Sequence, residues 1–143
     1  MKVADLPILF YAIDATSSGH GKASRWLEQA IDGPDPLGLA WPTVHSFLRL
    51  GTSAAFPGSM TDDEALGWVS EWLDAGARLA TDDGVDWRLF ALLLDASRRD
   101  LRNAVDDAHL AAVALSSGAT LASFDRDFEV FVPLGLRFER LGG

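Results

Sequence analysis

Residues 107–128 read DAHLAAVALSSGATLASFDRDF, and this stretch decides the fold class. Its small apolar residues predict a tightly packed helix that begins at Asn103 or Val105 and ends where Gly118 follows as the C-terminal cap. Residues 119–124 then have the pattern of a buried strand. A helix that leads through a glycine into a buried strand is typical of a fold in which strands and helices alternate.

The rest of the chain repeats this alternation. We predict four further strands, at 2–5, 37–41, 77–80 and 136–141. Further helices are predicted at 6–13, 21–31 and 86–97, one starting at Pro42, and one behind the Thr61–Glu64 capping box that stops at Gly76. Strands that alternate with helices form parallel sheets covered by helices on both faces. The sequence therefore predicts an α/β fold, a three-layer α/β/α sandwich around a mostly parallel sheet of about five strands, in a single domain of residues 1–143.

Composition narrows the function classes. The chain has no cysteine, which excludes a disulfide framework, a thiol nucleophile and a cysteine-based zinc site. It has no signal-peptide pattern and no apolar run approaching the roughly 20 residues of a membrane span, so we expect a cytoplasmic protein without a membrane partner. The net charge of −9 is unfavourable for general nucleic-acid binding. Arg98, Arg99 and Arg102 form the densest basic run, which is either a solvated face or a contact to a nucleic-acid backbone.

Three aspartates occupy comparable places in this scheme. Asp5 ends the first predicted strand, Asp125 ends the strand at 119–124, and Asp107 lies in the predicted first turn of the helix before that strand. In open parallel sheets, binding sites form beyond the carboxyl ends of the strands. Carboxylates that meet there repel one another unless they share a cation, and Mg²⁺ or Mn²⁺ suits oxygen ligands.

Each aspartate also has a purely structural interpretation. Asp5 can end a strand and cap the next helix, and Asp125 can belong to a turn. Asp107, in a first helical turn, can interact favourably with the helix macrodipole. The occurrence of all three at strand–helix junctions is what favours a functional site. Haloacid-dehalogenase-type phosphatases are excluded because only 16 residues follow Asp127, and receiver-like signalling domains because no lysine follows Lys22.

Three segments carry a family resemblance. The opening segment VADLPILFYA (3–12) and the pair DAHLAA (107–112) and ATLASFDRDF (119–128) resemble the PIN-domain ribonucleases, specifically the VapC toxins of type II toxin–antitoxin modules. The resemblance implies a PIN-like fold, Asp5, Asp107 and Asp125 as Mg²⁺-associated catalytic carboxylates, and Asp127 as a further catalytic candidate or a cap. It implies endonucleolytic cleavage of RNA, often transfer RNA, a small VapB-like antitoxin as partner, and a homodimer.

The sequence departs from the family pattern at two places. The family usually has asparagine two residues after the first aspartate, where this chain has Pro7. Many members carry glutamate in the third helix, where residues 44–47 (VHSF) supply no carboxylate. These departures leave an alternative open, in which the PIN domain has weakened catalysis and acts as an RNA- or protein-binding module.

Overall fold

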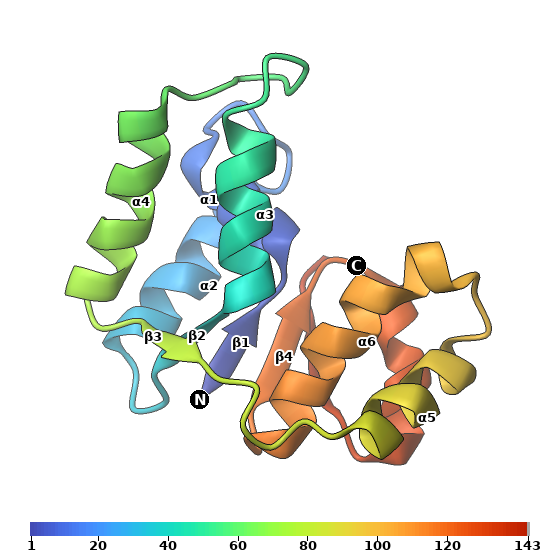
Figure 1. Cartoon of the computed structure of the whole chain (residues 1–143). Coiled ribbons are helices and arrows are strands. Elements are labelled where there is room, and N and C mark those ends of the chain that lie inside the picture. Colours follow the sequence, from blue (N-terminus) through green and yellow to red (C-terminus); the bar gives the residue numbers. More distant parts are fainter. Residues whose placement is uncertain (143) are drawn as a thin grey trace.

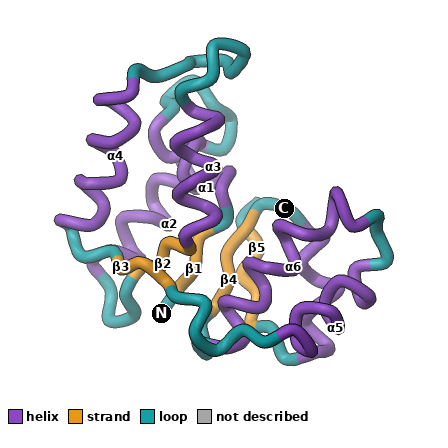
Figure 2. Tube along the Cα trace, viewed as in Figure 1, coloured by secondary structure: helices purple, strands orange, loops and turns teal. Residues whose placement is uncertain are grey.

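The computed structural model describes residues 1–142 and contains one sheet with the strand order β3-β2-β1-β4-β5 (Figures 1 and 2). Every neighbouring pair of strands is parallel. The strands are β1 (Lys2–Ala4), β2 (Leu37–Ala40), β3 (Arg78–Ala80), β4 (Thr120–Ser123) and β5 (Arg137–Arg140). The predicted parallel sheet of five strands is confirmed, and the segment at 136–141 is an edge strand as expected.

Within the described residues, seven helical segments surround the sheet. They are α1 (Leu6–Ile13), α2 (His20–Asp32), α3 (Trp41–Gly51), α4 (Asp62–Asp74), α5 (Trp87–Ser97), α6 (Leu101–Ser116) and the 3-10 helix η1 (Arg126–Leu134). Figure 1 shows α1 to α4 gathered at one side of the sheet, with α5 and α6 at the other. None of the helices within residues 1–142 combines the length and the apolar content required to cross a bilayer.

Alternation along the central strands divides the core into two parts. Ala4 and Ala122 are buried with the apolar faces of α1 to α4. Val3 and Leu121, one residue earlier on each strand, are buried with α5, α6 and η1. Because successive side chains of a strand point to opposite faces, each central strand contributes to both cores. This arrangement confirms the predicted three-layer α/β/α sandwich.

The pairing of β1 with β4 positions the acidic residues. Ala4 pairs with Ala122, and the backbone N–H of Asp5 donates to the carbonyl of Ala122 at 3.0 Å. Both strands run in the same direction, so their carboxyl ends lie at the same edge of the sheet. Asp5 and Asp125 therefore leave adjacent strands at that edge.

Two helix caps form at residues that the sequence analysis singled out as possible caps. The carboxylate of Asp5 accepts from the N–H of Leu6 at 2.9 Å, and a proline in the first turn of α1 loses no helical hydrogen bond. Thr61 and Glu64 form the predicted capping box of α4, with bonds of 3.2 and 3.1 Å.

The predicted start of α6 was wrong. This helix begins at Leu101, because the N–H groups of Asn103 and Ala104 already donate to the carbonyl of Asp100 at 2.9 and 3.0 Å. Asp107 consequently lies in the second turn of the helix instead of the first, where the macrodipole has little effect. The predicted end of α6 is confirmed, since Gly118 follows it with a φ of 65°.

Candidate active site

A pocket of about 260 Å³ lies where the carboxyl ends of β1 and β4 face α3 and α6. Asp5, Asp107 and Asp125 all line it. They come from the start of α1, the second turn of α6 and the start of η1. The structure thus brings the three aspartates singled out from the sequence to one cavity.

Asp5 is fixed through both of its carboxylate oxygens. Oδ1 accepts from the N–H of Leu6 at 2.9 Å, and Oδ2 accepts from the hydroxyl of Ser123 at 2.6 Å. The pKa of Asp5 is raised to about 6. Burial is the main cause, the bond from Ser123 opposes it, and the neighbouring charges of Asp107 and Asp125 add to it. The charged form of Asp5 is therefore disfavoured in this buried, acidic pocket.

Ser123 is a site residue that the sequence analysis missed. It is fully buried at the end of β4, and its Oγ donates to Asp5 while accepting from the N–H of Asp125 at 2.9 Å. One hydroxyl thus joins two of the three pocket aspartates. The available signal was a polar residue at the end of an apolar strand, two positions before Asp125.

Asp107 is paired with an arginine. Nη2 of Arg99 lies 2.6 Å from Oδ2 of Asp107, and Nη1 lies 3.4 Å from Oδ2 of Asp127. Burial raises the pKa of Asp107, the Arg99 hydrogen bond and charge lower it, and the charge of Asp125 raises it. The basic run noted in the sequence therefore reaches the acidic cluster through Arg99.

Asp127 lies apart from the other three predicted site residues. It is not among the residues lining the pocket, and about half of its side chain is exposed. Its N–H donates to Oδ1 of Asp125 at 2.8 Å, so Asp125 caps η1. Asp127 is connected to the pocket indirectly, through Arg99 and through this cap.

The α3 wall of the pocket is not acidic. In the part of the chain that the structure describes, α3 contributes Pro42, Thr43 and Ser46 to the lining, and Pro7 of α1 lies beside them. His109 also lines the pocket, with its Nε2 3.2 Å from Oδ1 of Asp82.

The donor chemistry fits a divalent cation. Carboxylates that raise one another's pKa gain from a shared positive charge, and hard cations such as Mg²⁺ prefer oxygen ligands. Asp5, Asp107 and Asp125 are the residues that would hold it. Within residues 1–142, however, no three Asp, Glu or His side chains are already close enough together to hold a metal ion. Cation binding would therefore require the carboxylates to move towards one another.

Comparison with known proteins identifies relatives along nearly the whole chain. Residues 3–131 match the PIN domain family. Ribonuclease VapC37 of Mycobacterium tuberculosis is 33% identical over 98% of this chain and 96% of its own length, and ribonuclease VapC43 of the same species is 32% identical over 92% and 90%. The crystal structure of VapBC2 from Rickettsia felis, bound to a DNA fragment from their promoter, shares the fold with a TM-score of 0.60 at 13% identity, covering 97% of each chain.

Proposed function

The chain belongs to the PIN-domain family, in its group of VapC ribonucleases, and on this premise we propose that it is a Mg²⁺-dependent endoribonuclease that acts as the toxin of a VapBC-type toxin–antitoxin module. The observation that carries the proposal is the convergence of Asp5, Asp107 and Asp125 on one pocket. The names of the relatives support ribonuclease activity. We choose Mg²⁺ as the cofactor because hard cations prefer the carboxylate oxygens that line the pocket, and Mn²⁺ can replace it.

The three carboxylates have distinct tasks in this proposal. When bound, Mg²⁺ supplies charge neutralisation at the phosphodiester and lowers the pKa of a water molecule. Ser123 bonds both the carboxylate of Asp5 and the backbone N–H of Asp125, and so joins two of the residues that would hold the cation. Asp107 completes the set from α6. The phosphodiester would lie over the pocket mouth, where these side chains orient the attacking water.

We extend the proposal to substrate and partners. The substrate is a structured RNA such as transfer RNA. The inhibitor is a VapB-like antitoxin, which is supported by the VapBC2 complex whose fold the chain shares. We further propose that the protein is a homodimer in which both pockets remain accessible.

The alternative function is that of an RNA- or protein-binding module with weakened catalysis. It is favoured by the α3 wall of the pocket, which contributes Pro42, Thr43 and Ser46 and no carboxylate among the described residues. A site with fewer ligands holds Mg²⁺ less tightly.

The test uses the purified chain free of antitoxin, incubated with total RNA and with transfer RNA in Mg²⁺, in Mn²⁺ and in EDTA. We expect discrete cleavage products in either metal and intact RNA in EDTA. Asp107→Asn should behave as the chain does in EDTA. Asp74→Asn, at the exposed end of α4, removes a carboxylate far along the chain from the pocket and should cleave normally. Intact RNA in both metals would contradict the proposal and favour the binding module.

A further inference from the structure

Arg99 supplies a positive charge beside the acidic pocket. Its guanidinium joins Asp107 and Asp127, at 2.6 and 3.4 Å, and the Asp107 contact is the shortest ion pair among the described residues. About a third of the arginine side chain is exposed, and about a fifth of that of Asp107. The contact is therefore partly shielded from water, which makes it stronger than a fully exposed pair.

The backbone around Arg99 determines where its side chain can reach. Arg98 ends α5 with a φ of 55°, in the left-handed region that non-glycine residues rarely adopt. The N–H of Arg99 donates to the hydroxyl of Ser97 at 3.4 Å. This turn places Arg99 between α5 and α6, facing Asp107 in the second turn of α6.

The guanidinium and the proposed cation need the same carboxylate. Oδ2 of Asp107 accepts a charge-assisted hydrogen bond from Arg99, and a divalent cation at the pocket would use the oxygens of that carboxylate. Two positive groups on one carboxylate repel each other. The second carboxylate partner of Arg99, Asp127, lies outside the pocket lining and helps to hold the guanidinium beside Asp107.

We propose that Arg99 is a positioning residue that competes with the divalent cation for Asp107 and thereby sets the cation concentration at which the active site assembles. The inference rests on the proposed function, because it assumes the cation site. Arg99 holds Asp107 in the cation-free protein and releases it when the cation binds. Only molecules in which Arg99 has released Asp107 can bind the cation fully, so the apparent affinity for the cation falls as the fraction of paired molecules rises.

The size of the effect follows from the exposure of the pair. Exposed ion pairs shift an equilibrium by a factor of up to about 5, and the short, partly shielded contact between Arg99 and Asp107 should lie at the upper end of this range. Removing Arg99 should therefore tighten cation binding by about that factor. Lysine at this position has a single ammonium group and cannot reproduce the forked contact to two carboxylates, so it should give a smaller gain, about 2-fold.

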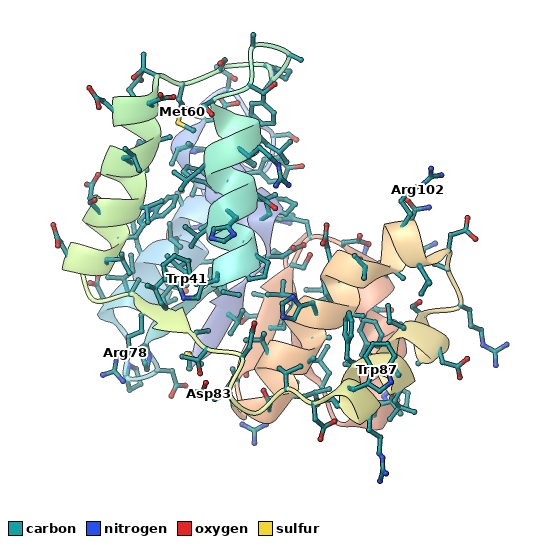
Figure 3. The ribbon with its side chains drawn as sticks, in the orientation of Figure 1. Trp41, Met60, Arg78, Asp83, Trp87 and Arg102 are labelled. Carbon is teal, nitrogen blue, oxygen red and sulfur yellow. The ribbon has the colours of Figure 1, made fainter. Side chains whose placement is uncertain are left out.

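The experiment measures Mn²⁺ binding alone, without RNA, from the electron paramagnetic resonance signal of free Mn²⁺. Measurements at pH 8 keep Asp5, whose pKa lies at about 6, in its charged form. The variants are Arg99→Gln and Arg99→Lys, with Arg102→Gln as the control for net charge. Figure 3 shows Arg102 at the outer end of α6 with its side chain directed away from the body of the protein. Circular dichroism establishes that each variant is folded.

We expect Arg99→Gln to bind Mn²⁺ about 5-fold more tightly than the unsubstituted chain, Arg99→Lys to be intermediate, and Arg102→Gln to stay within about 2-fold. Equal or weaker binding by Arg99→Gln would overturn the inference, as would an equal gain in Arg102→Gln. If Arg99→Gln does not fold, Arg99→Ala takes its place, because it also removes the guanidinium, and its comparison with Arg102→Gln decides in the same way.

A further variant separates this inference from the proposed function. Asp107→Asn should lose most of the Mn²⁺ binding. If neither the unsubstituted chain nor any variant binds Mn²⁺, the proposed cation site is wrong and the inference falls with it. If the chain binds Mn²⁺ through Asp107 but Arg99→Gln changes nothing, only the inference on Arg99 is wrong.

Discussion

The hydroxyl of Ser123 donates a 2.6 Å hydrogen bond to Oδ2 of Asp5, across the junction between two adjacent parallel strands. Ser123 is fully buried, so water does not compete for this bond. The same hydroxyl accepts from the backbone N–H of Asp125. The carboxylate of Asp5 is therefore joined to the backbone of Asp125 inside the protein before any ligand approaches.

Substitution of Ser123 by alanine should destabilise the protein and loosen the site. Asp5 would lose a donor to a partly buried carboxylate, which costs about 1–3 kcal/mol in the free energy of unfolding. Its pKa should also rise above the present value of about 6, because the Ser123 bond lowers it. Urea unfolding measures the first effect. Ser24→Ala is the matched control, since the Ser24 hydroxyl bonds to a carbonyl of its own helix at 2.7 Å. Equal losses in the two variants would contradict a special role for Ser123.

The stability of the cation-free protein should depend on Asp5 through pH. An ordinary aspartate titrates near 3.8, whereas burial raises the pKa of Asp5 to about 6. Between these values the folded state binds more protons than the unfolded state, so the contribution of Asp5 to stability falls as pH rises. The full effect is at most about 3 kcal/mol. Asp5→Asn does not titrate, so it should gain stability relative to the unsubstituted chain as pH increases from 4 to 7 in EDTA.

Asp14 provides a control of opposite sign for this measurement. Hydrogen bonds from the Thr16 side chain and backbone lower the pKa of Asp14 below its ordinary value. Its contribution to stability is present above the unfolded pKa and is lost as pH falls through the folded pKa. Asp14→Asn should therefore lose stability relative to the unsubstituted chain as pH rises to about 4, and the difference should change little between pH 4 and 7. A difference between Asp5→Asn and the unsubstituted chain that does not change with pH would contradict the prediction for Asp5.

Local signals in the sequence were sufficient for much of the fold. Strand alternation, the Thr61–Glu64 capping box and Gly118 each depend on residues close together in the chain, and the structure confirms them. The start of α6 was misplaced because Asp100 makes no side-chain cap bond, and its backbone carbonyl starts the helix instead.

The candidate site was only partly predictable. General rules for parallel sheets were enough to bring Asp5, Asp107 and Asp125 to one pocket. The contact between Arg99 and Asp107 depends on the turn at Arg98, whose positive φ would ordinarily be expected at glycine. The bond from Ser123 to Asp5 joins residues 118 positions apart in the chain. Neither contact follows from local pattern.

The substitution Ser46→Glu should strengthen cation binding. Ser46 lines the pocket from α3, on the wall that contributes no carboxylate in the described structure. An added carboxylate supplies a further oxygen ligand, and we expect about 10-fold tighter Mn²⁺ binding. In EDTA the same variant should be less stable, because the new charge repels Asp5 and Asp107. His45→Glu is the control, since it adds a carboxylate one residue away on an exposed position outside this pocket. An equal gain in both variants would show that only net charge matters.

Asp125 and Asp127 should differ sharply in their effect on RNA cleavage, although they are separated by one residue. Asp125 lines the pocket, whereas Asp127 lies outside it and reaches the site through Arg99 at 3.4 Å. Asp125→Asn keeps an oxygen that can accept the 2.8 Å bond from the N–H of residue 127, so the cap of η1 is retained while the charge is lost. We expect a decrease of about 100-fold or more in the cleavage rate, as for the removal of other groups that stabilise transition-state charge. Asp127→Asn removes one carboxylate partner of Arg99 and should lower the rate by less than about 10-fold. Single-turnover cleavage of transfer RNA in Mg²⁺ measures both rates, and equal losses would place Asp127 in the reacting centre beside Asp125.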